Sequence, residues 1–140
     1  MISAITPDGN NQDKNEYGLA FGHMYTVFSA HEVGGERLIR VRNPWGAETY
    51  EGPWSDGDSN WDRTIESGGK TFRDYFTDLG LYMEKNDGFF FIDYTTYFDS
   101  FSETIVHEDM SDKVQDSVIF TDTRESDVNT HQFTLRSAID

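Results

Sequence analysis

The chain has 140 residues, of which 15% are aromatic, and a net charge of −15. This length suits one compact domain, with or without part of a second, and the aromatic side chains can build a core that has few aliphatic residues. The charge argues against binding to nucleic acid or to an anionic membrane, and the absence of cysteine excludes a disulfide, a thiolate metal site or a cysteine nucleophile from this chain.

Three strands are predicted in the first third of the chain. Residues 2–5 are predicted to form a short initial strand, and residues 6–18 are polar and rich in turn formers. Residues 22–33 and 36–43 are rich in β-forming side chains and flank Gly34-Gly35, a pattern typical of an antiparallel hairpin. We therefore expect the second and third strands to pair directly.

The second strand of this hairpin ends in the sequence RVRNPWG. Pro44 and Gly46 favour a turn at this point. Because side chains alternate along a strand, Asn43 lies on the same face as Ile39 and Val41. A simple turn residue has no reason to point to the apolar face, so the pattern indicates a specific role for the Asn43 side chain.

The rest of the chain is predicted to alternate between loops, short helices and strands. Residues 46–70 are loop-like, residues 71–83 open with the apolar spacing of a short helix, and residues 89–94 read as a mostly buried strand. Aromatic residues at helical spacing predict a second short helix over 93–101, followed by a strand over 103–107. The predicted fold class is α+β, an antiparallel sheet packed with short helices.

The composition changes after residue 107. We predict one domain over 1–107, an acidic linker over 108–130, and the truncated start of a second, β-rich domain over 131–140. The first residues lack the pattern of a signal peptide, and no apolar run approaches the roughly 20 residues that span a bilayer. We therefore expect a soluble, intracellular, cytoplasmic protein without a membrane span.

His23 and Asn43 lie at similar distances on either side of the predicted hairpin turn. Antiparallel pairing would bring them within reach of a side-chain hydrogen bond. An amide oxygen that holds one ring nitrogen fixes the tautomer and orientation of a histidine, which can then take a proton from a nucleophile and return it to a leaving amine. Trp45 is placed to cover this pair and exclude water. A lone strand histidine is more often structural, but these matched partners favour a catalytic one.

Three stretches resemble a known family: GLAFGHMYTVFSAHEV, RLIRVRNPWGAETYEGPWSDGDSNW and NDGFFFIDYTTYFDSFSETIV. Over residues 2–107 the chain resembles the second half of the calpain-type cysteine protease core, the subdomain that carries the catalytic histidine and asparagine. Residues 131–137 resemble the entry strand of the β-sandwich that follows this core. The resemblance implies the β-rich half-core of the papain-like fold.

The resemblance also implies a mechanism. A cysteine on the preceding half-core attacks the scissile carbonyl of a protein or peptide substrate, His23 acts as base and acid, and Asn43 orients His23. Trp45 would shield the pair and act as the wedge between half-cores. Because this chain has no cysteine, we expect it to be inactive alone and to need the Cys-bearing half-core of the same protease or of another protein. The alternative is a catalytically dead calpain-like module that serves as a scaffold or interaction domain.

Calcium is a further implication of the resemblance. The family binds it through acidic positions in the loop after the Asn-Pro-Trp-Gly turn and around the Asp-Gly pair. The candidate ligands in this chain are Asp56, Asp87, Glu48 and Glu51. Two positions where the family has glutamate are Thr49 and Phe89 here. Because calcium prefers six to eight oxygen ligands, a site that lacks two carboxylates is expected to be weak or lost.

Overall fold

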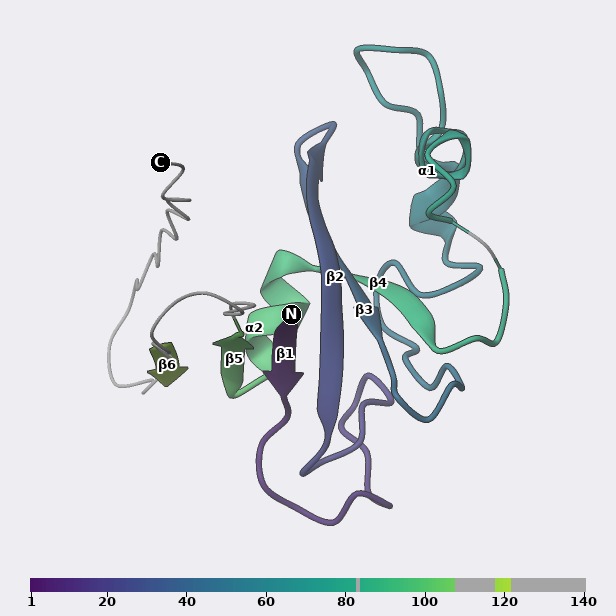
Figure 1. Ribbon diagram of the computed structural model, residues 1–140. Coiled ribbons are helices and arrows are strands. Elements are labelled where there is room, and N and C mark those ends of the chain that lie inside the picture. The colour runs from purple at the N-terminus through teal and green to yellow at the C-terminus, as the bar shows by residue number, and fades with distance from the viewer. Residues whose placement is uncertain (83, 108–117, 122–140) are drawn as a thin grey trace, which may run out of the picture.

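The computed structural model describes residues 1–82, 84–107 and 118–121. These residues form one antiparallel sheet with the strand order β4-β3-β2-β1-β5-β6, accompanied by short helices (Figure 1). The strands are β1 (Ile2–Ile5), β2 (Met24–Val33), β3 (Glu36–Arg42), β4 (Phe89–Asp93), β5 (Glu103–Val106) and β6 (Val118–Thr121). The helices are η1 (Ser59–Asp62), a 3₁₀ turn, α1 (Phe72–Asp78) and α2 (Tyr94–Ser100). The fold is α+β, as the sequence predicts.

The β2–β3 hairpin forms the centre of the sheet, and its closed end projects beyond the other strands (Figure 1). Gly34 and Gly35 close it with φ values of 56° and 80°, which side-chain-bearing residues rarely adopt. Gly34 also packs closely, because a Cβ built on it would lie 2.9 Å from Cζ of Phe72. A bulge shifts the register between Val27 and Ser29. The hairpin predicted from the two β-rich runs is therefore confirmed.

Both faces of the sheet are covered by apolar clusters, because β3 contributes buried side chains to each face. Val41 belongs to one cluster, which includes Tyr97 of α2, and Leu38 belongs to the other, which includes Phe76 of α1. Trp61 of η1 is fully buried in the second cluster. The aromatic residues thus supply much of the core, as the composition indicates.

Local signals explain where the helices begin. The hydroxyl of Thr71 accepts a hydrogen bond from the backbone N–H of Asp74 at 3.1 Å, which caps α1. The carboxylate of Asp93 accepts one from the N–H of Thr96 at 3.0 Å, which caps α2. Both helices were predicted, whereas η1 lies in a stretch that the sequence indicates only as a loop.

Residues 1 and 107 meet at one end of the β1–β5 pair. Strands β1 and β5 pair so that Ile2 lies opposite Val106. One residue further out, the amino group of Met1 donates to the carbonyl of His107 and the N–H of His107 donates to the carbonyl of Met1, each at 2.7 Å. Residues 1 and 107 are therefore neighbours in space.

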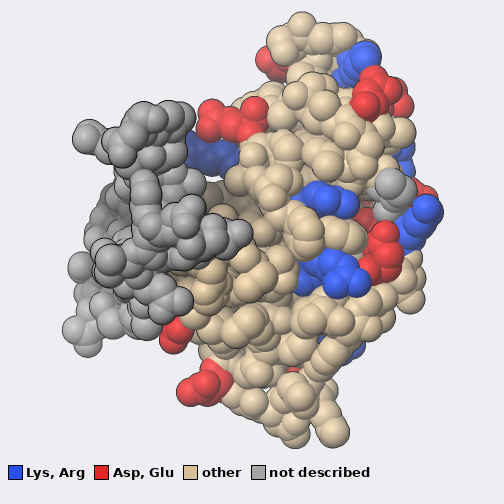
Figure 2. Space-filling view, in the orientation of Figure 1, with Lys and Arg blue, Asp and Glu red and all other residues tan. Residues whose placement is uncertain are grey.

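Beyond residue 107 the structure describes only β6. This strand pairs with β5 and lies within the range predicted as an acidic linker, while the predicted start of a second domain over 131–140 lies outside the described residues. Charged side chains on the face in Figure 2 form small, separate groups of either sign. In the part of the chain that the structure describes, no helix is long and apolar enough to cross a membrane.

Candidate active site

The hairpin brings His23 and Asn43 together at its open end. His23 precedes β2, Asn43 follows β3, and Nε2 of the imidazole lies 3.0 Å from Oδ1 of the amide. The register places Thr26 opposite Arg42, so extending it puts position 25 across from Asn43. His23 is two residues away from that position, so its imidazole extends along the strand to meet the amide of Asn43. The predicted hydrogen bond is present, and the catalytic role of the pair stays a prediction.

The orientation of the Asn43 side chain follows from its second contact. Oδ1 also accepts a hydrogen bond from the backbone N–H of Trp45 at 3.1 Å, which only the amide oxygen can do. The backbone of Asn43 is held as well, because its N–H donates to the carbonyl of Gly88 at 2.8 Å and its carbonyl accepts from the N–H of Gly46 at 3.0 Å. With 0% of its surface exposed, Asn43 is a rigid, buried acceptor.

This geometry sets the tautomer of His23. Because the Asn43 oxygen can only accept, Nε2 of the neutral ring carries the proton, and Nδ1 is left with its lone pair. Among the described residues, no hydrogen bond occupies Nδ1. A histidine held in this way presents a free base nitrogen on the side of the ring away from Asn43.

Two aromatic rings confine the imidazole of His23. The ring of Tyr25 meets it edge-on, with centroids 4.8 Å apart and an interplanar angle of 87°. The indole of Trp45 lies across it at 4.2 Å and 38°. Trp45 remains 49% exposed, whereas Tyr25 is fully buried. Trp45 thus covers His23 on one side and leaves a large apolar surface exposed on the other.

The candidate calcium ligands are only partly gathered in the structure. Glu48 and Asp56 line one open cleft of about 380 Å³, whose other lining includes Glu84, Lys85 and Asn86. Burial, together with the charge of Asp56 beside it, raises the pKa of Glu48 to about 8. Burial also raises the pKa of the Asp56 carboxyl. Both carboxyl groups therefore resist ionisation in this cleft.

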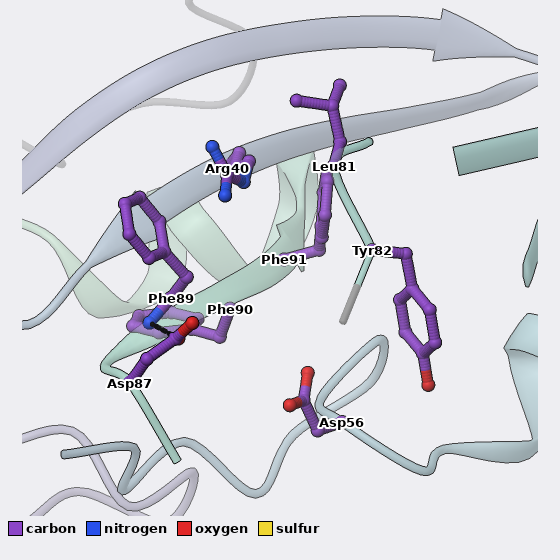
Figure 3. A pocket seen from close by; sticks show the side chains of 8 residues that line it. All are labelled: Arg40, Asp56, Leu81, Tyr82, Asp87, Phe89, Phe90 and Phe91. Carbon is purple, nitrogen blue, oxygen red and sulfur yellow. Dashed lines mark hydrogen bonds between the residues drawn. The ribbon is translucent and has the colours of Figure 1, made fainter. Parts of the chain in front are cut away.

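The remaining two candidates do not complete a ligand set. Glu51 is exposed and does not line the cleft. Asp87 lines a separate cavity of about 20 Å³ with Asp56 and Arg40 (Figure 3), and one of its oxygens already accepts the N–H of Phe89 at 3.0 Å. Across the described ranges, no three carboxylate, histidine or cysteine side chains are grouped to hold a metal.

The loops that these carboxylates belong to are joined by protein hydrogen bonds instead. The N–H of Glu48 donates to Oδ1 of Asn86 at 2.7 Å, and the N–H of Lys85 donates to Oδ2 of Asp56 at 3.2 Å. The donor set does not supply the six to eight oxygens that calcium prefers. Calcium binding therefore stays a prediction.

Sequence reasoning missed one residue that contacts the site. Thr6, next to β1, makes hydrogen bonds to the backbone of His23 from a buried position. A single threonine between a strand and a proline carries no sequence signal for such a contact, because the contact joins segments that only the folded sheet brings together.

Comparison with known proteins relates this chain to a single protease family. The family described as "Calpain family cysteine protease" matches residues 1–108. The calpain-type cysteine protease DEK1 of Arabidopsis thaliana is 39% identical over 62 residues, which are 44% of this chain and 3% of that protein. Calpain-12 of Mus musculus is 31% identical over 107 residues, covering 71% of this chain and 14% of that protein. The chain therefore spans a small fraction of the length of these relatives.

Proposed function

Because this chain belongs to the calpain family of cysteine proteases, we propose that residues 1–107 form the half of a papain-like protease core that supplies the general base. In this proposal His23 is the base and acid, Asn43 holds it in orientation, and Trp45 shields the pair from water. The nucleophile is a cysteine on the other half-core, and the substrate is a protein or peptide.

The proton path follows from the geometry of His23. Nδ1 accepts the proton of the cysteine thiol, and the thiolate attacks the scissile carbonyl carbon. The protonated ring then donates that proton to the leaving amine as the carbon–nitrogen bond breaks. In the second half of the reaction Nδ1 takes a proton from water, whose oxygen attacks the acyl carbon. The carbon–sulfur bond then breaks, and the cysteine sulfur takes the proton back from Nδ1. Throughout, Asn43 accepts from Nε2 and stabilises the charged ring.

The missing nucleophile implies a partner. With no cysteine in its 140 residues, this chain cannot complete the reaction alone. The half-exposed indole of Trp45 lies beside His23, where a second half-core has to approach if its thiol is to reach Nδ1. We infer that the Cys-bearing half-core of the same protease, or of another protein, docks against this surface.

The observation that carries the proposal is the 3.0 Å contact between Nε2 of His23 and the buried Oδ1 of Asn43, while no hydrogen bond from the described residues occupies Nδ1. The test is labelling of the chain together with its Cys-bearing half-core by a thiol-reactive peptide inhibitor. We expect His23→Ala to abolish labelling and His31→Ala to preserve it, because the imidazole of His31 makes its side-chain hydrogen bond to Ser29. Equal labelling of both variants contradicts the proposal.

A second candidate function is a catalytically dead module that serves as a scaffold or interaction domain. Thr49 and Phe89 favour this candidate, because they stand where the family resemblance leads us to expect two calcium-binding glutamates. The residue at the nucleophile position of the Cys-bearing half-core separates the two candidates. Serine or alanine there supports the dead module, and inhibitor labelling of a cysteine there supports the protease.

A further inference from the structure

Thr6 is bound almost completely to the segment that carries His23. It is 2% exposed and lies one residue after β1. Its N–H donates to the carbonyl of His23 at 3.0 Å, and its Oγ1 accepts the N–H of His23 at 2.9 Å. The hydroxyl proton of Thr6 is shared between the carbonyl of Ala20, at 2.7 Å, and the carbonyl of His23, at 3.1 Å.

This arrangement differs from an ordinary strand pair. The β1–β2 ladder ends with Ile5 opposite Met24, so Thr6 and His23 form the next pair beyond it. In an ordinary ladder the N–H of His23 would donate to the backbone carbonyl of Thr6. Here the side-chain hydroxyl of Thr6 takes the place of that carbonyl. The backbone of His23 therefore stays fixed although it lies outside the sheet.

The residue before His23 is held just as closely. Gly22 has a φ of 56°, and its N–H donates to the carbonyl of Pro7 at 2.7 Å. A Cβ built on Gly22 would lie 2.5 Å from the carbonyl oxygen of Gly9, so only glycine fits without a shift. Hydrogen bonds thus join residues 6–7 to residues 22–23 directly and fix the two segments against each other.

We propose that Thr6 is a positioning residue for His23. Its hydroxyl fixes the backbone from which the imidazole reaches Asn43, and so determines whether Nδ1 points to the docking face. The inference rests on the proposed function, in which His23 is the general base. Catalysis is sensitive to such positioning, because a displacement of about 1 Å can lower a rate by about 100-fold.

Three variants separate positioning from general stability. Thr6→Val keeps the shape of the side chain but leaves the N–H of His23 without its acceptor, and Thr6→Ser keeps the hydroxyl. Thr71→Val is the matched control, because it removes a hydroxyl that also accepts a backbone N–H, but at the start of α1. Loss of the Thr71 hydroxyl destabilises the fold without removing a contact of His23.

The experiment is NMR of the ¹⁵N-labelled 140-residue chain at about pH 8.5, where an ordinary imidazole is neutral. For the original chain, Thr6→Ser and Thr71→Val, we expect His23 to appear as the single Nε2–H tautomer. For Thr6→Val we expect a tautomer mixture and exchange of the Nε2 proton with water about five- to tenfold faster, equivalent to the loss of about one net hydrogen bond. A folded Thr6→Val chain with unchanged His23 signals overturns the proposal.

Amide exchange provides a test that needs no folded Thr6→Val variant. In the original chain, the proposal requires the N–H of His23 to be as protected as the β1–β2 ladder, and exchange at the rate of an exposed loop amide overturns it. Failure of the proposed function has a different signature: a Cys-bearing half-core without a nucleophile leaves these His23 signals intact. Conversely, an active assembly in which Thr6→Val changes neither kcat nor the His23 signals overturns positioning alone.

Discussion

At the scale of single residues, burial of the Asn43 side chain has a cost in folding free energy that its hydrogen bonds explain. Its Oδ1 accepts two hydrogen bonds, from His23 and Trp45, whereas its buried Nδ2 has no partner among the described residues. An unpaired buried donor of this kind costs about 1–3 kcal/mol. A residue kept at such a cost is better explained by what its oxygen does for His23 than by stability.

Replacing Asn43 tests this explanation. In Asn43→Ala the Nε2 proton of His23 loses its acceptor, so we expect its NMR signal to broaden beyond detection through exchange with water. The control is Asn86→Ala, which also removes an amide oxygen that accepts a backbone N–H, but in the loop beside Glu48. Loss of the His23 signal in both variants would point to general loosening of the fold instead.

The raised pKa of Glu48 predicts how stability depends on pH. The folded chain holds a proton on Glu48 up to about pH 8, whereas the unfolded chain releases it near the ordinary value, about 4.3. The stability from this group is therefore fully present below about pH 4.3 and is lost as the pH rises through 8. Glu48→Gln, which stays neutral, should lose less stability between pH 5 and pH 8.5 in urea unfolding. Glu51→Gln, at an exposed position, should follow the original chain.

At the scale of elements, the two short helices depend on their caps and on packing. Each has seven residues, which is too short for a stable isolated helix. The cap at Thr71 is an element-level test: Thr71→Ala should lower the free energy of unfolding by about 1 kcal/mol, while Thr71→Ser should restore it. Urea unfolding measures both, and equal stability of all three proteins would show that packing alone holds α1.

How far the sequence predicts each element depends on the range of its interactions. The strands 2–5, 36–43 and 89–94 were predicted to within about a residue, because apolar patterns and glycine turns are local signals. The sequence also placed Asn43 on the buried face. It did not predict the pairing of β6 with β5 or the contacts of Thr6, because each of these joins separate segments of the chain. It also did not predict η1, a single 3₁₀ turn that is too short to show a helical pattern.

At the scale of the whole molecule, two of the three tryptophans lie in contrasting environments. Trp61 is fully buried among aromatic rings of the second cluster, whereas Trp45 is half-exposed beside His23. Trp61→Ala should cost about 3–5 kcal/mol in urea unfolding, because it leaves a large cavity. Trp45→Ala should change the stability of the isolated chain far less but weaken its association with a Cys-bearing half-core. Comparable losses of stability in both would argue against Trp45 as a docking residue.

Calcium binding is also a property to test on the whole chain. Thr49 and Phe89 replace two expected carboxylates, and hydrogen bonds from the backbone of Glu48 and Lys85 join the two loops directly. We therefore expect isothermal titration calorimetry to detect no binding heat at calcium concentrations up to about 1 mM, the weak end of protein calcium sites. Heat that disappears in Asp56→Asn would instead establish a calcium site in this cleft.

The reciprocal hydrogen bonds between Met1 and His107 hold the two ends of the segment 1–107 side by side. A unit of this kind can be spliced into a surface loop of a host protein, because the host strands need to separate only by about the 5 Å between neighbouring strands. The same geometry allows a circular permutant: residues 107 and 1 can be joined by a short linker, and new termini opened at the exposed tip of the hairpin, at Gly35. Residues 1 and 107 thus adjoin at one end of β1, whereas His23 follows the opposite end of that strand.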